Sequence, residues 1–211
     1  MTQICSYEAV ILRSFDVGEA DRFLILLTRE FGKIAARARG VRRTGSRMGG
    51  HLLPFQHLSL LLREGRAGFT VEAAARKCPA TPITLRQFAM IEQGAELLCV
   101  LLHDGEPLPE VFDLTLAFFE ASKCSGETFL PFSLSLLRHL GLLPETANTA
   151  FFGTLTEEES SFVTCCASGN FAAKSPSEPF RKRLLGIADR LTAEQTSHAL
   201  RSGIVAAALH A

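Results

Sequence analysis

The first 80 residues alternate between short apolar runs and turn-forming residues, a pattern typical of β-strands. Each of five runs predicts a strand, over residues 7–15, 22–28, 33–39, 55–63 and 69–75. From Ala36 to Arg39 the third run has strict period two, with arginines at the outward positions of a half-buried strand. Five short strands within about 70 residues indicate a small barrel. A partly open OB-type barrel and an SH3-like barrel both fit this pattern.

After residue 79 the apolar positions recur at helical spacing. This spacing predicts three helices with broad apolar faces, over residues 85–102, 111–121 and 129–140. Pro107 or Pro109 is expected to open the second helix, and Gly141 and Pro144 to stop the third. Residues 149–177 have no clear period, and we expect an irregular segment there.

Two further helices are predicted from capping-box spacing near the end of the sequence. Ser175 and Glu178 would begin a helix that runs to Arg190. Thr192 and Gln195 repeat the spacing before an alanine-rich stretch, which predicts a separate last helix.

The fold class predicted from these periods is α+β, with a barrel domain over residues 1–79 and a helical domain over residues 80–211. The chain is 47% hydrophobic and 21% charged, as in ordinary globular proteins. Its formal net charge is zero, but residues 1–80 hold 13 Lys and Arg against seven Asp and Glu. Residues 81–211 hold nine against 15. Such asymmetry points to nucleic-acid binding by the basic half, although chance explains these totals equally well.

A basic, glycine-rich run from Lys33 to Gly50 is the leading functional candidate. Its 18 residues contain six cations and no acid. A basic strand that continues into a flexible loop suits a phosphate backbone, because each neutralised phosphate releases condensed counterions. Arginine adds base stacking and forked hydrogen bonds. A solvated strand edge kept charged against aggregation is the alternative, but the imbalance favours nucleic acid.

Aromatic side chains are candidate stacking platforms in barrels of this kind. The chain has no Trp and one Tyr, so phenylalanines must supply them. Phe31, in the turn before the basic strand, is expected to be exposed. Phe15, Phe23, Phe55 and Phe69 are expected in the core.

No catalytic motif is found, and we predict that the chain is not an enzyme. Gly40 and Gly45 with Ser46 have the frame of a phosphate loop, but the lysine and the following apolar helix are missing. Motifs of serine hydrolases, zinc proteases and zinc deaminases are absent, and the six histidines do not cluster.

The location expected from the sequence is the cytoplasm. The N-terminal nine residues carry no Lys or Arg, so no secretory signal is predicted. No apolar run reaches the roughly 18 residues that a membrane span needs. The six cysteines are irregularly spaced, which predicts free thiols rather than a disulfide framework.

Five segments resemble, in order and spacing, the N-terminal domain of the bacterial DNA repair protein RecO family. They read YEAVILR, GEAD, LTREFGK, ARGVRR and SRMGGHLLPF, and they begin at residues 7, 18, 27, 38 and 46. The helical half retains the general layout and the turn Leu142-Leu143-Pro144. The resemblance implies an OB-fold whose basic face carries Arg13, Arg22, Lys33, Arg37, Arg39, Arg42, Arg43 and Arg47.

The same resemblance implies a nucleoid-associated recombination mediator. Such proteins bind single- and double-stranded DNA, anneal complementary strands and, with RecR, help to load RecA onto DNA coated by single-strand-binding protein. Docking of that protein's acidic, Phe-ended tail would need an apolar pocket rimmed by cations. Candidates for the rim are Arg138 or the cluster Arg181, Lys182 and Arg183, unless these only solvate helix ends. An RNA-binding barrel and a protein-only adaptor remain as alternatives.

Many members of the family carry a zinc site built from two C-x-x-C pairs. At the corresponding positions this sequence has Thr149, Phe152, Ala173 and Pro176, none of which suits a closed tetrahedral zinc site. Cys165 and Cys166 lie nearby but are adjacent, and in an extended segment they would point to opposite faces. We therefore expect no metal and no cofactor, and ordinary packing through the phenylalanines of this stretch: Phe151, Phe152, Phe162 and Phe171.

Overall fold

The computed structural model describes residues 4–46, 48–79, 81–125, 127–144 and 149–195. Within them the chain forms two compact units. The first comprises the residues up to Pro82 together with Leu102–Phe112, and the second comprises Ile83–Leu101 and the residues from Asp113 onward. The chain therefore returns to the first unit after one helix of the second. A single boundary at residue 79 does not describe this return.

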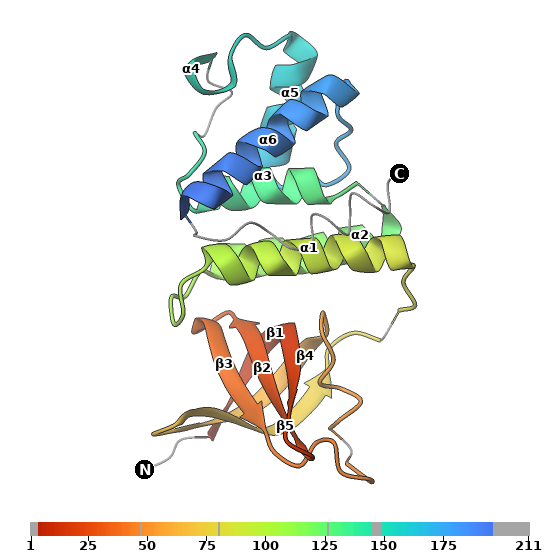
Figure 1. The fold of residues 1–211 in the computed structure, drawn as a ribbon, viewed down its shortest axis with the longest axis vertical. Coiled ribbons are helices and arrows are strands. Elements are labelled where there is room, and N and C mark those ends of the chain that lie inside the picture. Colours follow the sequence, from red (N-terminus) through yellow and green to blue (C-terminus); the bar gives the residue numbers. More distant parts are fainter. Residues whose placement is uncertain (1–3, 47, 80, 126, 145–148, 196–211) are drawn as a thin grey trace. The chain divides into compact units, whose positions relative to one another are not determined.

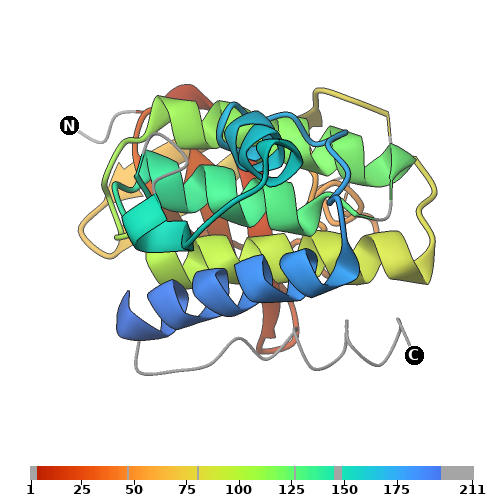
Figure 2. The same ribbon diagram turned by 90° about the horizontal axis from the view of Figure 1, so that it is seen from above.

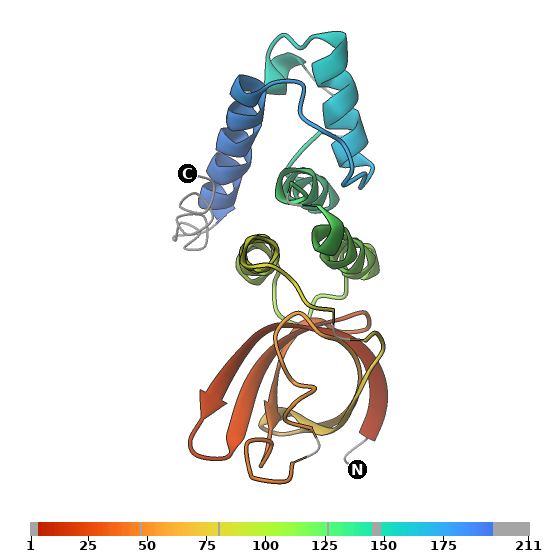
Figure 3. The same ribbon diagram turned by 90° about the vertical axis from the view of Figure 1, so that its right-hand side faces the viewer.

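The first unit is a closed barrel of five strands. Figure 1 labels the strands, and Figure 3 shows the barrel nearly end on. All five predicted strands are present: β1 (Ile4–Val17), β2 (Asp21–Thr28), β3 (Gly32–Ala38), β4 (His57–Gly65) and β5 (Gly68–Arg76). Their order is β1-β2-β3-β5-β4, and β3 pairs with β5 in parallel while the other pairs are antiparallel. This is the OB order, which decides between the two barrels that the sequence left open.

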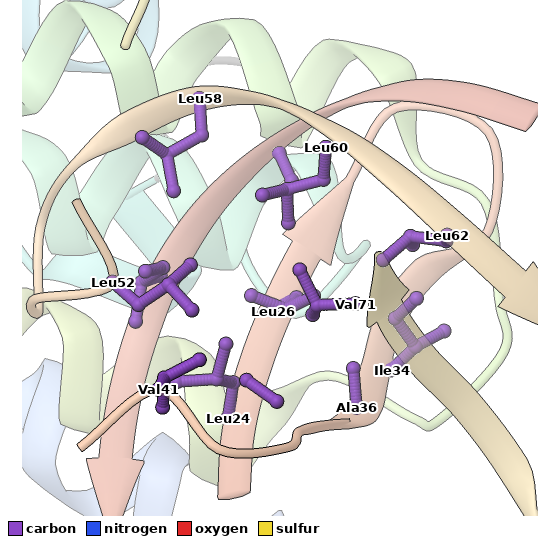
Figure 4. Close-up of a cluster of buried hydrophobic side chains, with 13 residues drawn as sticks. Leu24, Leu26, Ile34, Ala36, Val41, Leu52, Leu58, Leu60, Leu62 and Val71 are labelled. Carbon is purple, nitrogen blue, oxygen red and sulfur yellow. The ribbon is translucent and has the colours of Figure 1, made fainter. Parts of the chain in front are cut away.

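The barrel core is built from alternate residues of every strand, as period two requires. Leu24 and Leu26 of β2 meet Leu60 of β4 inside the barrel (Figure 4). Small residues on β3, Ala36 and Ala38, complete the lining. Each fully buried leucine stabilises the fold by about 1.5–3 kcal/mol relative to an exposed one.

A β-bulge in β1 changes which of its residues face the core. The register between β1 and β2 shifts between Ile11 and Arg13. Before the shift Ile11 points into the core, whereas after it Ser14 lies opposite the core residue Leu24. Because side chains alternate along a strand, Arg13 and Phe15 then face outward.

The returning segment 102–112 is anchored to the start of β3. Gly32 has φ +62°, and a Cβ there would overlap the carbonyl oxygen of Glu106. Next to it the Lys33 ammonium lies 3.2 Å from the Asp104 carboxylate, and the Gly105 amide donates to the Lys33 carbonyl at 2.8 Å. Only glycine combines this backbone conformation with so close an approach.

The second unit contains most of the helices. Along the chain these are α1 (Leu85–Leu101), α2 (Pro109–Cys124), α3 (Phe129–His139), α4 (Thr149–Phe152), α5 (Glu157–Ala167) and α6 (Glu178–Gln195). α2 begins at Pro109, which is one of the two prolines that were expected to open it. In this unit α3 packs against α1, α5 and α6 (Figure 2). Its Phe132 stacks on Phe118 of α2 with ring centroids 4.0 Å apart, and Phe171 packs beside both rings.

The expectation of an irregular segment over residues 149–177 was wrong, because α4 and α5 lie there. Thr156 caps α5 in a capping box: its hydroxyl accepts from the Glu159 amide, and the Glu159 carboxylate accepts from the Thr156 amide. The acidic run from Glu157 to Glu159 is the first turn of this helix, where carboxylates interact favourably with the positive end of the helix dipole.

The predicted ends of the next helix were also incorrect. Ser177, not Ser175, caps α6, since its hydroxyl accepts from the Phe180 amide at 3.3 Å. The helix does not end at Arg190 but continues to Gln195, and the Thr192 hydroxyl donates to the Ala188 carbonyl at 2.8 Å. The separate last helix predicted beyond it lies outside the described residues. None of the described helices has both the length and the apolar character needed to cross a bilayer.

Candidate nucleic-acid interface

The outer surface of β1, β2 and β3 carries two phenylalanines and an arginine in one cross-strand row. Phe15 of β1 pairs with Phe23 of β2, and Phe23 pairs with Arg37 of β3. Their neighbour Leu24 points into the core, so these three side chains face outward. The face of β2 and β3 is the surface on which OB-folds bind oligonucleotides and oligosaccharides.

The expected exposure of the aromatic side chains was wrong for three rings. Phe31 is not exposed but packs against the barrel core, with its ring centroid 5.0 Å from that of Tyr7 and 5.4 Å from that of Phe69. Phe15 and Phe23, expected in the core, are 47% and 38% exposed. The bulge in β1 turns Phe15 outward, and Phe23 lies out of phase with Leu24. For Phe23 the sequence held the signal, because period two counted from Leu24 places it outside.

Asp21 fixes the arginine of this row. Its carboxylate accepts from the Arg37 guanidinium at 2.8 and 2.9 Å and from the Gly40 amide at 2.8 Å. The Gly40 amide, followed by Arg37, lowers the pKa of Asp21 from its usual value. Arg37 is nevertheless half exposed. Asp21 thus holds the Arg37 guanidinium beside the two exposed rings, and part of this guanidinium stays in contact with solvent.

Asp16 organises a second pair of arginines at the end of β1. Its two carboxylate oxygens lie 3.1 Å from Nε of Arg22 and 3.2 Å from Nε of Arg42. Arg22 also donates to the carbonyls of Gly49 and Leu52, and its side chain is only 18% exposed. Arg22 therefore holds the loop before β4, and Arg42 ties the turn after β3 to the β1–β2 turn.

The remaining predicted cations differ in how accessible they are. Lys33 pairs with Asp104 and its side chain is 14% exposed. Arg13 is half-buried on β1. Arg39 and Arg43 are exposed and form no ion pair within the part of the chain that the structure describes. Arg47 lies outside the described residues. Of the predicted cations that the structure describes, those open to a ligand thus lie at the end of β3 and in the turn that follows.

The cations proposed for a partner tail lie in the second unit. Arg138 of α3 donates to the carbonyl of Ala167 at 2.7 Å and so braces the end of α5. On α6, Arg181 pairs with Glu178 one turn earlier, and the Arg183 guanidinium lies 5.0 Å from the Phe180 ring centroid. Lys182, between them, is exposed.

The residues at and near the positions of the family's zinc site do not form a set of zinc ligands. Cys165 is half-buried and Cys166 fully buried on α5, and burial followed by the neighbouring Cys165 raises the pKa of the Cys166 thiol to about 12. Phe152, at one of the corresponding positions, is buried instead. Over the residues with described positions, no three His, Cys, Asp or Glu side chains lie together as metal ligands.

The chain combines a five-stranded barrel in the OB strand order with a unit of helices. This combination places it among proteins that link a small OB barrel to a helical domain. Two family comparisons make this class specific. The family described as Recombination protein O N terminal matches residues 1–75, and Recombination protein O C terminal matches residues 84–201. The chain belongs to the recombination protein O family.

Curated relatives agree with this assignment. The DNA repair protein RecO of Myxococcus xanthus is 35% identical over 162 residues, which cover 74% of this chain and 66% of the relative. That of Anaeromyxobacter dehalogenans is 37% identical over 142 residues, 64% of this chain and 56% of the relative. That of Bifidobacterium adolescentis is 58% identical over 60 residues, 28% of this chain and 24% of the relative. In each case the chain spans less than two thirds of the relative's length.

Proposed function

We propose that this chain is a non-catalytic DNA-binding mediator of recombinational repair whose barrel holds single-stranded DNA. The name of the relatives, DNA repair protein RecO, supports a role in repair. The observation that carries the proposal is the group of exposed arginines at the end of β3 and in the turn after it, of which Arg37 lies beside exposed rings on the face that OB-folds use for ligands. Arg37, Arg39 and Arg43 are its central residues.

The proposal extends to the steps that family membership implies. The chain binds duplex as well as single-stranded DNA, anneals complementary strands in the nucleoid and, with RecR, helps RecA to replace single-strand-binding protein. The acidic tail of that protein docks on the cationic side of α6 around Lys182. Arg138 contributes less in this proposal, because its guanidinium already binds the Ala167 carbonyl.

Contact with phosphates makes binding depend on salt. If four to six phosphates are neutralised, the plot of log K against log salt on single strands should have a slope of about −3 to −4. Each lost phosphate contact should reduce the steepness of that slope by about 0.7 and weaken binding to all sequences alike.

The test is the double substitution Arg39→Glu and Arg43→Glu, followed by titration of single-stranded DNA at several salt concentrations. These two side chains are exposed and form no ion pair with any residue whose position is described, so the fold should persist. A matched control is Lys174→Glu with Arg190→Glu, which changes the net charge equally at exposed positions of the second unit. We expect weaker binding and a shallower slope for the first variant only. Binding that is indifferent to salt and to both variants would refute the proposal.

The same titration separates the alternative functions. An RNA-binding barrel would prefer duplex RNA over single-stranded DNA in competition. A protein-only adaptor would bind neither nucleic acid at moderate salt.

A further inference from the structure

The barrel exposes an apolar strip that its own fold does not use. Phe15 and Val17 follow each other on the outer face of β1 and are 47% and 38% exposed, and Phe23 of β2 is 38% exposed. Phe15 and Phe23 lie directly opposite each other, where Cβ atoms are about 4.5–5.5 Å apart. Two phenylalanine rings thus share one small patch of surface.

Cations border this patch on the side of β3. Arg37 is the register partner of Phe23 on the next strand, and the bond to Asp21 holds its guanidinium in place. The exposed Arg39 follows two residues later, in the turn directly after β3. An occupant of the patch therefore has to bring flat apolar groups together with negative charge.

We infer that Phe15 and Phe23 form a stacking platform for the bases of single-stranded nucleic acid, while Arg37 and Arg39 hold the backbone beside them. Every base has a π-face, so stacking on phenylalanine needs no particular sequence. The inference rests on the proposed function and adds the groups that contact the bases. The role of these two rings could not be inferred from the basic run, because that run lies on β3 and the loop after it, whereas the rings lie on β1 and β2.

The charge of the patch favours bases over a second protein surface. A protein partner would need exposed apolar groups that are interleaved with acids at the same spacing. A nucleic-acid strand carries flat apolar bases and one phosphate per nucleotide by construction. Bases in a duplex are already stacked on each other, so the platform predicts that these rings contribute to binding of single strands and not of duplexes.

One experiment uses the absence of tryptophan from the chain. Phe23→Trp places a single indole in the patch. Ile4→Trp places one at a control site that is 50% exposed, at the other end of β1, where this strand pairs with β4. An oligo(dT) strand of about 16 nucleotides, long enough for one OB-fold, should quench the fluorescence of the Phe23→Trp protein. An abasic strand of the same length and a duplex should quench it little, and Ile4→Trp should respond to none of the three.

A second experiment measures affinity for the same strands. Phe15→Thr with Phe23→Thr removes both rings but keeps strand-forming residues at outward positions, and Ile4→Thr is the matched control. We expect the double variant to lose about fivefold or more per ring on oligo(dT), with unchanged affinity for the abasic strand and an unchanged salt slope. Phe15→Tyr with Phe23→Tyr should retain binding, because the rings are kept.

Equal binding of oligo(dT) and abasic strand by the native chain, unaltered by loss of the rings, would overturn the platform but leave the proposed function standing. Failure to bind either strand at moderate salt would instead refute the proposed function itself. Analytical sedimentation tests whether a second copy of the chain covers the patch instead. If the native chain is a dimer and the Thr variant is a monomer that still binds DNA, the patch is a dimer interface and the inference is overturned.

Discussion

Replacing Gly94 by alanine should destabilise the helical unit, although the same change usually strengthens a helix. Gly94 lies inside α1, where alanine would normally gain about 1 kcal/mol. A Cβ on Gly94 would overlap the ring of Phe118, whose Cζ would lie 2.7 Å away. Phe118 is fully buried and stacks on Phe132 at 4.0 Å, so its ring has no room to move aside. Overpacking of this kind costs about 1–3 kcal/mol, and after the gain in helix propensity we expect a net loss of up to about 2 kcal/mol.

Gly186→Ala is the matched control, since Gly186 lies inside α6 with open space around its missing Cβ. This variant should gain about 0.5–1 kcal/mol. Urea unfolding followed by far-UV circular dichroism measures both, because the chain offers no tryptophan signal and most helices belong to the second unit. An unfolding midpoint of Gly94→Ala at or above that of the native chain would show that the close contact with Phe118 does not constrain this position.

Two further predictions concern the barrel and the partner site. Hydrogen bonds from Lys77 and then His57 lower the pKa of Glu8 from its usual 4.5. A lowered carboxyl pKa stabilises the fold above the unfolded pKa, and this contribution is lost as pH falls through the folded pKa. Glu8→Gln should therefore lower the melting temperature at neutral pH and flatten its fall below about pH 4.5 in scanning calorimetry; a parallel acid limb would contradict this. For the partner site, Lys182→Ala should weaken binding of a synthetic acidic, Phe-ended peptide in calorimetry, and unchanged affinity would remove α6 from consideration.

The strands of the barrel could be predicted from the sequence because the signals that mark them are local. Period two and turn residues mark each strand within a few positions, and the predicted ranges match the observed strands closely. The strand order was not local information, since both small barrels fit the same pattern. The first three helices were equally clear from their apolar spacing, whereas α5 was missed because its first turn is a run of acids.

The candidate site was predicted in part, and its gaps have physical causes. The basic run was visible, but the sequence could not show that Asp16 occupies Arg22 and Arg42 or that Asp21 holds Arg37. These pairs join residues separated by turns and strands, and only the folded register brings them together. The bulge after Ile11 also shifts the phase of β1 without any mark in the hydrophobic pattern, which is why Phe15 was expected inside.

The anchoring of residues 102–112 on β3 has a consequence for the gene. The coding sequence of the barrel unit is interrupted by α1, so a fragment that stops after β5 lacks the groups that meet Gly32 and Lys33 at the start of the basic strand. The five strands are continuous in sequence, but the complete first unit cannot be cut out, fused or exchanged between proteins at one breakpoint. Inheritance of the whole unit would require α1 to travel with it, which ties the histories of the two units together.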